Sequence, residues 1–153
     1  MDIEGWEIEA VRSDAEWIRK KKPTIWIECN ENPEIKQVFS ALKWAGYNIY
    51  YFAFPSFRKN NYLRNMKPIF PCAYEAGLLA LKPGQIAALS DEAKNNECLF
   101  AVINEFKDLK EMMWQTPRWA LDKWTMLSRP ELIALLARNT KNEDYVTFLS
   151  NAE

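Results

Sequence analysis

Three short apolar runs, each followed by proline, asparagine or another turn signal, constrain the fold of this chain more than any other feature of its sequence. Their length and their content of β-branched and aromatic residues predict buried strands. The three runs are 24–29, 47–54 and 74–81. Apolar residues at helical spacing predict two helices. The first covers 6–22 and is ended by Pro23, and its expected apolar face consists of Trp6, Ala10, Val11, Trp17 and Ile18. The second covers about 33–45 and is ended by Gly46, and its expected apolar face consists of Ile35, Val38, Phe39, Leu42 and Ala45.

The order of these segments predicts an α/β domain. Helices that alternate with strands across short connections are typical of layered folds with a largely parallel sheet, and strands that are apolar along their length indicate burial on both faces. The segment 56–73 predicts a long loop, which in a compact domain is more often functional than accidental. From 85 to about 138 the pattern is mostly helical, although 97–103 fits either a helix or a strand. We therefore expect a domain over 1–84 with a mostly helical extension over 85–153 packed on it.

The chain contains no histidine, which removes several kinds of chemistry. Ser-His-Asp and Cys-His catalysis are excluded, and so is any metal centre that needs a histidine ligand. Cys29, Cys72 and Cys98 are odd in number and far apart, which argues against a disulfide framework and for a reducing, cytoplasmic setting. A net charge of −1 gives no general attraction to nucleic acid, and no apolar run reaches the ~18 residues of a membrane span.

Three carboxylates surround a glycine at the start of the chain, just before the first predicted helix. They belong to Asp2, Glu4 and Glu7, and the glycine is Gly5. In doubly wound sheets ligands bind at the carboxyl ends of strands, so clustered acids at a strand-to-helix junction form a natural site. Such acids suit four roles: holding a sugar hydroxyl, binding a divalent cation, accepting a proton from a substrate hydroxyl, or neutralising a helix N-terminus.

This opening run resembles a motif of a known enzyme family. Asp-Ile-Glu-Gly-Trp-Glu over 2–7 is similar to the Asp-hydrophobic-Glu-Gly-x-Glu motif of class I, S-adenosylmethionine-dependent methyltransferases of the FkbM type. Three later segments resemble that family's fifth strand, the entry to its sixth strand and its last strand, in the same order: 22–28, 42–50 and 74–80. The resemblance covers about 1–83 and implies the C-terminal half of a Rossmann-like class I methyltransferase sheet.

The resemblance also implies an activity and roles for particular residues. It implies an O-methyltransferase that acts on a hydroxyl of a sugar or small metabolite, with S-adenosylmethionine as its cofactor. Asp2, Glu4 and Glu28 are then the candidate catalytic residues, and Asp2 also contacts the cofactor. Glu7 and Asn30 become candidate substrate-binding residues at the same crevice. We expect no metal-binding residues.

The long loop adds two further candidates. Its basic and aromatic stretch 57–64 contains Arg58 and Tyr62, which suit the binding of an anionic or sugar-bearing acceptor. A solvated surface loop is the other interpretation of the same stretch.

One departure from the family pattern limits the expected activity. Class I methyltransferases hold the cofactor with a glycine-rich turn, whereas this chain has 4 glycines and no Gly-x-Gly. We therefore expect the chain to lack the cofactor-binding half. The expected partners are a small-molecule or glycan acceptor and a separate N-terminal half or a second copy of the chain, with no nucleic acid. The alternative is a degenerate, non-catalytic methyltransferase remnant that serves as a protein-interaction module.

Overall fold

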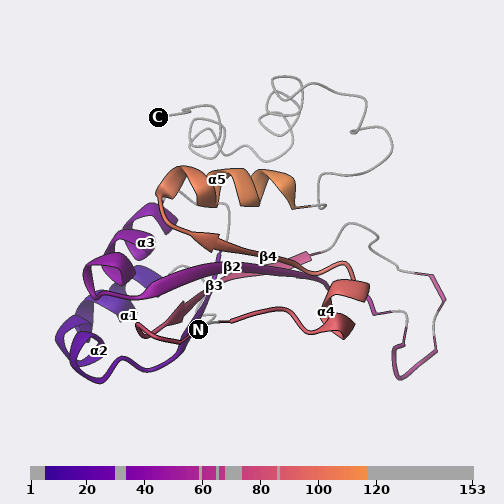
Figure 1. Cartoon of the computed structure of the whole chain (residues 1–153), viewed down its shortest axis with the longest axis horizontal. Helices are drawn as coiled ribbons and strands as arrows, with labels where there is room; N and C mark the ends of the chain where they lie inside the picture. Colours follow the sequence, from indigo (N-terminus) through magenta and orange to yellow (C-terminus); the bar gives the residue numbers. More distant parts are fainter. Residues whose placement is uncertain are drawn as a thin grey trace.

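The computed structural model describes residues 6–29, 34–58, 60–64, 66–67, 74–85 and 87–116. In this part of the chain the helices and strands follow the order drawn in Figure 1. Their bounds are α1 Glu7–Ser13, α2 Ala15–Lys21, β1 Ile25–Glu28, α3 Ile35–Trp44, β2 Asn48–Pro55, β3 Tyr74–Leu81, α4 Asp91–Asn95, β4 Leu99–Ile103 and α5 Phe106–Gln115. The helical pattern expected between 117 and about 138 lies outside the described residues.

The strands form one four-stranded sheet in the order β1-β3-β2-β4. The three strands expected from the sequence are confirmed, and the ambiguous segment 97–103 contributes the fourth, β4. The expectation of a largely parallel sheet is wrong, because every neighbouring pair is antiparallel. Two strands cause the difference: β3 lies between β1 and β2 and is antiparallel to both, and β4 is antiparallel to β2. β1 and β2 are both antiparallel to β3, so they run in the same direction, and α3 connects them. They form a βαβ unit with an antiparallel strand between its two strands.

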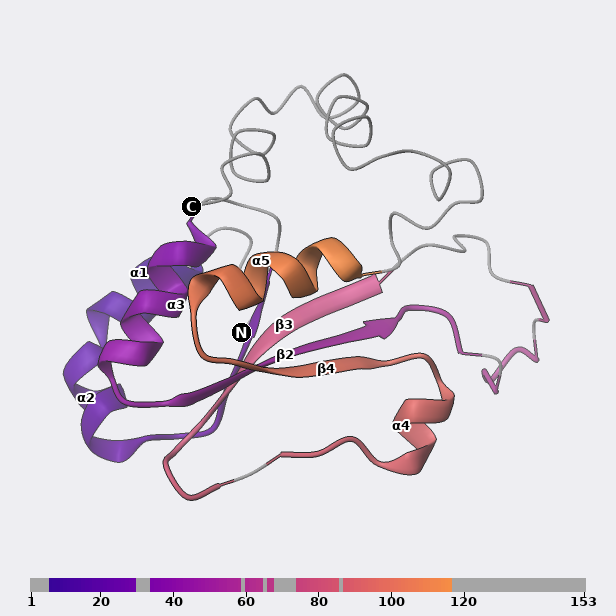
Figure 2. The same ribbon diagram turned by 45° about the horizontal axis from the view of Figure 1, so that its top comes forward.

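One face of the sheet carries the hydrophobic core. Figures 1 and 2 show α5 lying across this face, with α3 beside it and α1 and α2 beyond α3. Side chains alternate between the two faces along each strand, so Ile27, Tyr51 and Leu78 point toward the helices and are fully buried. Leu109 and Met113 of α5 join the same buried cluster. β4 and α5 lie beyond residue 84, yet they belong to the same sheet and the same core.

The first helix predicted from the sequence is two helices in the structure. The break falls at Asp14, whose φ of −113° and ψ of 22° leave the helical region between α1 and α2. Ile8, Val11 and Ile18 are the buried residues of the pair. The expected apolar face included Trp6 and Trp17, which is wrong, because both are exposed.

The end of α2 is fixed to the end of α3 by one lysine. Lys22 has a φ of 46° and ends α2 in the left-handed conformation. Its ammonium group donates hydrogen bonds to the carbonyl oxygens of Ala45 at 2.7 Å and Gly46 at 3.1 Å. Gly46 has a φ of 77°, which suits a glycine just after a helix. The predicted stops of both helices are therefore confirmed.

The apolar face predicted for α3 is confirmed as well, since Ile35, Val38, Phe39, Leu42 and Ala45 are all buried. Among the described residues, no helix has both the length and the apolar character that crossing a membrane requires.

Candidate functional site

The structure describes four of the seven residues that the sequence singled out for a site. Asp2, Glu4 and Asn30 lie outside the described residues. Glu28 is the last residue of β1 and is half-buried, and Glu7 is the first residue of α1. Tyr62 is 99% exposed. Arg58 follows the carboxyl end of β2 and lines a pocket there.

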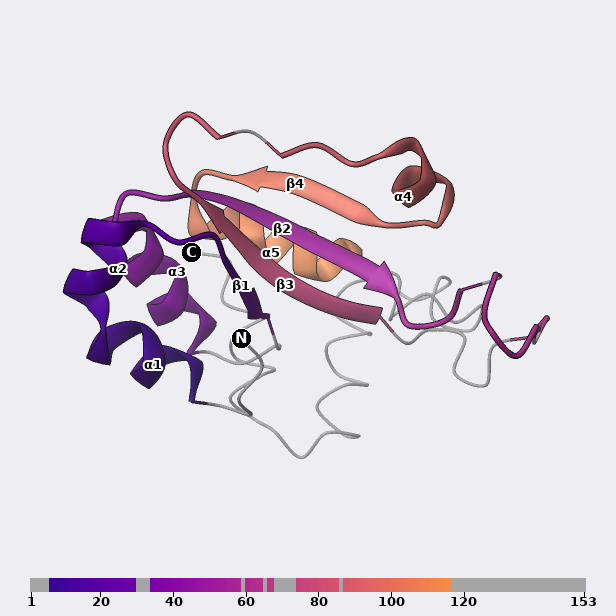
Figure 3. The same cartoon turned by 90° about the horizontal axis from the view of Figure 1, so that it is seen from below.

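Glu28 lies on the face of the sheet that points away from α5. The backbone of this second face is seen from below in Figure 3. Because strand register places many aromatic residues on it, we call it the aromatic face. Alternation along the strands assigns to it Trp26, Glu28, Tyr50, Phe52, Phe54, Gly77, Leu79, Phe100 and Val102. Within the described part of the chain, no helix lies across its centre in Figure 3, and Val102 is 55% exposed. Among the residues that the structure describes, the apolar side chains on this side of the strands therefore form an aromatic surface and are not covered by a second layer of helices.

Strand register places Glu28 in line with the centre of the aromatic face. Glu28 is opposite Gly77, Gly77 is opposite Phe52, and Phe52 is opposite Phe100. Adjacent strands are roughly 5 Å apart, so the backbones at Glu28 and Phe52 are separated by about 10 Å. Because Gly77 lacks a side chain, the indole of Trp26 extends over it and would overlap a β-carbon at that position. Glu28 thus borders an aromatic surface that continues from β1 to β2.

The rings of this surface also contact one another. Tyr50 and Phe100 stack with centroids 5.1 Å apart, and Phe52 lies edge-on to Phe100 at 6.3 Å. Phe54 is tilted against Phe52 at 5.4 Å. Such contacts hold the rings in defined orientations, which a binding surface requires.

The pocket lies at the edge of the aromatic face, where the carboxyl end of β2 meets α4. Its volume is about 270 Å³. Phe52, Phe54 and Pro55 of β2 form its apolar side. The remaining lining residues come from the loop after β2 and from the segment around α4: Arg58, Ser90, Glu92, Ala93, Asn96 and Cys98.

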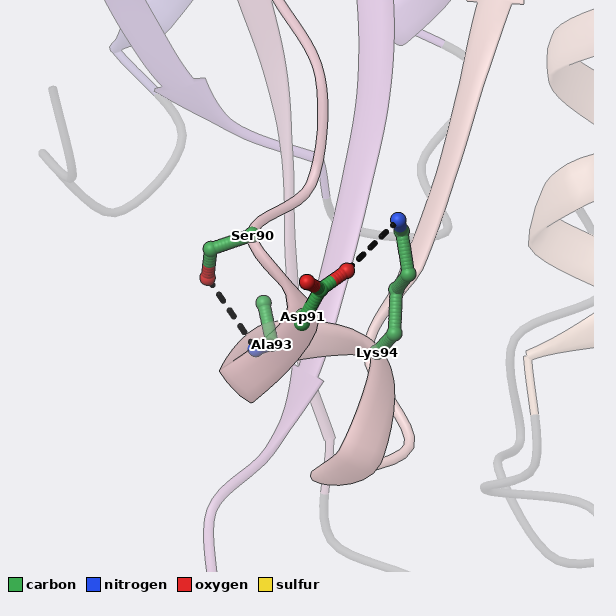
Figure 4. Close-up of polar contacts among 4 residues, drawn as sticks. All are labelled: Ser90, Asp91, Ala93 and Lys94. Atoms are coloured by element: carbon green, nitrogen blue, oxygen red, sulfur yellow. Dashed lines mark hydrogen bonds and ion pairs between the residues drawn. The ribbon is translucent and has the colours of Figure 1, made fainter.

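The short helix α4 is held by its own side chains, as Figure 4 shows. Ser90 is the N-cap, and its hydroxyl oxygen accepts a hydrogen bond from the Ala93 N–H at 3.2 Å. Asp91 pairs with Lys94 at 3.1 Å. The side-chain amide of Asn96 donates to the carbonyl oxygen of Glu92 at 2.8 Å, which closes the last turn. These bonds fix the backbone from which Glu92 and Asn96 line the pocket.

Two opposite charges of the pocket remain unpaired within the described residues. Neither the Arg58 guanidinium nor the Glu92 carboxylate forms a hydrogen bond or ion pair there. Burial raises the pKa of the Cys98 thiol, while the nearby positive charge of Arg58 acts in the opposite direction. Arg58 therefore lies close enough to the thiol of Cys98 for its positive charge to act on it.

Sequence reasoning identified Arg58 but missed the rest of the pocket. Phe52 and Phe54 look like ordinary core residues in the sequence, and Glu92 and Asn96 fall in a segment interpreted as helical extension. The signal that was present was Ser90 followed by Asp91 and Glu92, an N-cap with acids in the first turn. This pattern predicts a short helix, but it does not predict that the helix lies next to β2.

Within the described ranges, no group of three or more Cys, Asp or Glu side chains is placed to hold a metal ion. Neither Cys29 nor Cys98 forms a disulfide bond in the described part of the chain, and Cys29 is buried in the core beside the end of β1. Comparison with protein-family models, with curated proteins and with solved structures finds no match for this chain.

Proposed function

We propose that this chain is the acceptor-binding half of an S-adenosylmethionine-dependent O-methyltransferase of the FkbM type, acting on a hydroxyl of a sugar or other small metabolite. The observation that supports the proposal most is the arrangement of β1, α3 and β2. Two strands that point the same way bring their carboxyl ends to one edge of the sheet, where ligands of doubly wound folds bind. Glu28 ends the first of these strands, and the pocket follows the second.

The segments that resemble the family support the same proposal. The resemblance assigns 22–28, 42–50 and 74–80 to the fifth, sixth and last strands of the methyltransferase sheet. The corresponding strands β1, β2 and β3 are three adjacent members of one sheet. β3 lies between β1 and β2 and is antiparallel to both, so the proposal rests on the shared direction of β1 and β2 and not on β3. β4 lies outside the region of resemblance and adds a strand next to β2.

The described residues do not suit the cofactor itself. S-adenosylmethionine needs a glycine-rich turn, and the 153 residues contain no Gly-x-Gly. The pocket of about 270 Å³ is also below the ~300–1,000 Å³ that is usual for larger ligands. Asp2, which the resemblance assigns to the cofactor, lies outside the described residues. We therefore assign this chain the acceptor side of the reaction and derive no step for cofactor binding.

On the acceptor side, we assign Glu28 the role of general base. It ends a strand on the face that carries the aromatic surface, so its carboxylate can accept the proton that an acceptor hydroxyl loses. Positioning of the acceptor accounts for much of the rate in such a transfer. The aromatic surface supplies that positioning, because Trp26 and Phe52 lie between Glu28 and the pocket.

Transfer of a radiolabelled methyl group tests the proposal. The protein should be made from the complete open reading frame that contains these codons, including any in-frame codons upstream, and offered sugars and hydroxylated metabolites. We expect a labelled methyl ether on one class of acceptor. Absence of transfer to every acceptor, together with absence of S-adenosylmethionine binding in calorimetry, would falsify the proposal.

A second candidate function, a protein-interaction module, is favoured by the exposed tryptophans of the helices. Trp6, Trp17 and Trp44 are 67%, 54% and 57% exposed, which is unusual for so large an apolar side chain. Light scattering on the purified chain distinguishes the two candidates. A stable dimer that Trp17→Ser dissociates supports the module, whereas a monomer at all concentrations contradicts it.

A further inference from the structure

The pocket beside α4 combines an aromatic side with a polar rim, and its lining indicates which ligand it fits. Phe52 and Phe54 present ring surface on the side of β2, and Pro55 extends that surface. The rings are oriented by contacts with each other and, for Phe52, with Phe100. The side formed by β2 is therefore apolar, and it is suited to the face of a ring rather than to a charged group.

The rest of the pocket lining offers hydrogen-bond donors and acceptors together. Arg58 presents N–H donors, and Glu92 presents two carboxylate oxygens; neither has a side-chain partner among the described residues. The Asn96 amide nitrogen is used within α4, which leaves its side-chain oxygen to accept a hydrogen bond. The Ser90 oxygen already accepts from Ala93, so its hydroxyl hydrogen is available to donate. A ligand in the pocket thus meets both hydrogen-bond donors and acceptors.

The size and the charge of the pocket narrow the class of ligand. About 270 Å³ accommodates a small ring but not a nucleotide or an extended chain. One positive and one negative side chain line it, so the rim has no net charge with which to favour an anion such as phosphate. A molecule with hydroxyls around its edge, a C–H face and no charge matches both sides. A single neutral sugar ring has this chemistry.

We propose that the pocket formed by Phe52, Phe54, Arg58, Glu92 and Asn96 binds a neutral monosaccharide. The ring packs its C–H face on the two phenylalanines, and its hydroxyls exchange hydrogen bonds with the three polar side chains. Naming this sugar as the methyl acceptor rests on the proposed methyltransferase function, but binding to the pocket does not. Binding and transfer are therefore measured separately.

Saturation-transfer difference NMR on the full chain tests the binding, without cofactor. The probes are the methyl glycosides of glucose, galactose and rhamnose, with inorganic phosphate and phenylalanine as competing classes. We expect one glycoside to bind with a Kd on the order of 1 mM, as suits a small, open pocket. Arg58→Ala and Glu92→Gln should each weaken that binding roughly threefold to tenfold, the usual effect of losing one or two hydrogen bonds.

Two matched variants control for general effects of charge. Asp91→Asn changes a carboxylate on the same helix that pairs with Lys94 and does not line the pocket (Figure 4). Arg64→Ala removes an exposed arginine of the same loop that is also outside the lining. Both should bind the glycoside as the parent chain does, and circular dichroism should show all four variants folded.

Three results would overturn the inference: no glycoside binds, phenylalanine or phosphate binds more tightly, or Arg58→Ala and Glu92→Gln bind as well as the controls. The failures of the two proposals are distinguishable. If a glycoside binds but no methyl group is transferred, the sugar-binding inference stands and the proposed methyltransferase function fails. If methyl transfer occurs and neither Arg58→Ala nor Glu92→Gln changes its rate, the methyltransferase function stands and the sugar-binding inference fails.

Discussion

The indole of Trp26 on β1 lies over the backbone of Gly77 on the adjacent strand β3, in the space that a β-carbon would need. The two residues are diagonal neighbours on the aromatic face, since Trp26 is opposite Leu79 and Gly77 is opposite Glu28. A glycine inside a strand normally weakens it, and here it marks a close approach. This packing lets the aromatic surface extend from β1 toward the pocket without interruption.

Replacing Gly77 by alanine should therefore destabilise the chain, because the new methyl group overlaps the indole. We expect Gly77→Ala to lower the free energy of unfolding by about 2 kcal/mol, typical of overpacking. In a Trp26→Ala background the same change should be nearly neutral, because the indole is gone and alanine is tolerated in a strand. Urea unfolding of the two single variants and the double variant measures the coupling. Equal costs of Gly77→Ala in both backgrounds would contradict this packing.

A buried hydrogen bond joins the centre of the sheet to the end of α5. The hydroxyl of Thr116 donates to the Met112 carbonyl at 3.0 Å, so it accepts from the Tyr51 hydroxyl at 2.5 Å. Tyr51→Phe should lower the free energy of unfolding by about 1 kcal/mol, the usual net value of such a bond. Tyr62→Phe removes the hydroxyl of a fully exposed tyrosine and should change stability by less than about 0.5 kcal/mol. If the two variants are equally stable, the bond contributes nothing.

The stability of the folded chain should depend on pH through Asp108, near the start of α5. Backbone N–H groups of Glu105 at 2.9 Å and Asn104 at 3.0 Å donate to its carboxylate, and the bond from Glu105 is the first cause that lowers the pKa of Asp108. A pKa lower in the folded chain means stability that is present above the unfolded pKa and lost as pH falls through the folded one.

Asp108→Asn should therefore be less stable than the parent chain near neutral pH. The difference should shrink as the pH falls below about 4, the ordinary range of an aspartate, where the parent carboxyl becomes protonated too. Thermal unfolding at about pH 7 and about pH 3 measures both differences. A difference that stays constant between the two would show that the charge of Asp108 is not what caps α5.

Much of the fold was predictable from local patterns. The strands β1, β2 and β3 and the helix α3 each have enough apolar residues at the right spacing to identify them. Lys22-Pro23 and Gly46 end their helices through backbone conformations that sequence reveals. The antiparallel pairing of the strands was not predictable in this way. A central antiparallel strand with an aromatic second face has the same continuous apolar pattern as a parallel strand buried under helices.

The site was less predictable, because it depends on which segments meet. Glu28 could be identified from its place at the end of an apolar run, and Arg58 from its loop. Phe52 and Phe54 became candidates only once the strand register showed that they point away from α5. Glu92 and Asn96 required the placement of α4 next to β2, which no local signal encodes.

The role of Glu28 provides the most direct test of the central claim, that the carboxyl edge of β1 and β2 is the acceptor site of a methyltransferase. Labelled methyl transfer by the protein made from the complete open reading frame should be compared for Glu28→Gln and for Glu75→Gln. The second is a matched change at an exposed glutamate of β3, on the same face of the sheet as Glu28. We predict that kcat falls about 100-fold or more for Glu28→Gln, as expected on loss of a general base, and stays near the parent value for Glu75→Gln. Equal rates for the two variants, or no methyl transfer by the parent protein, would contradict the claim.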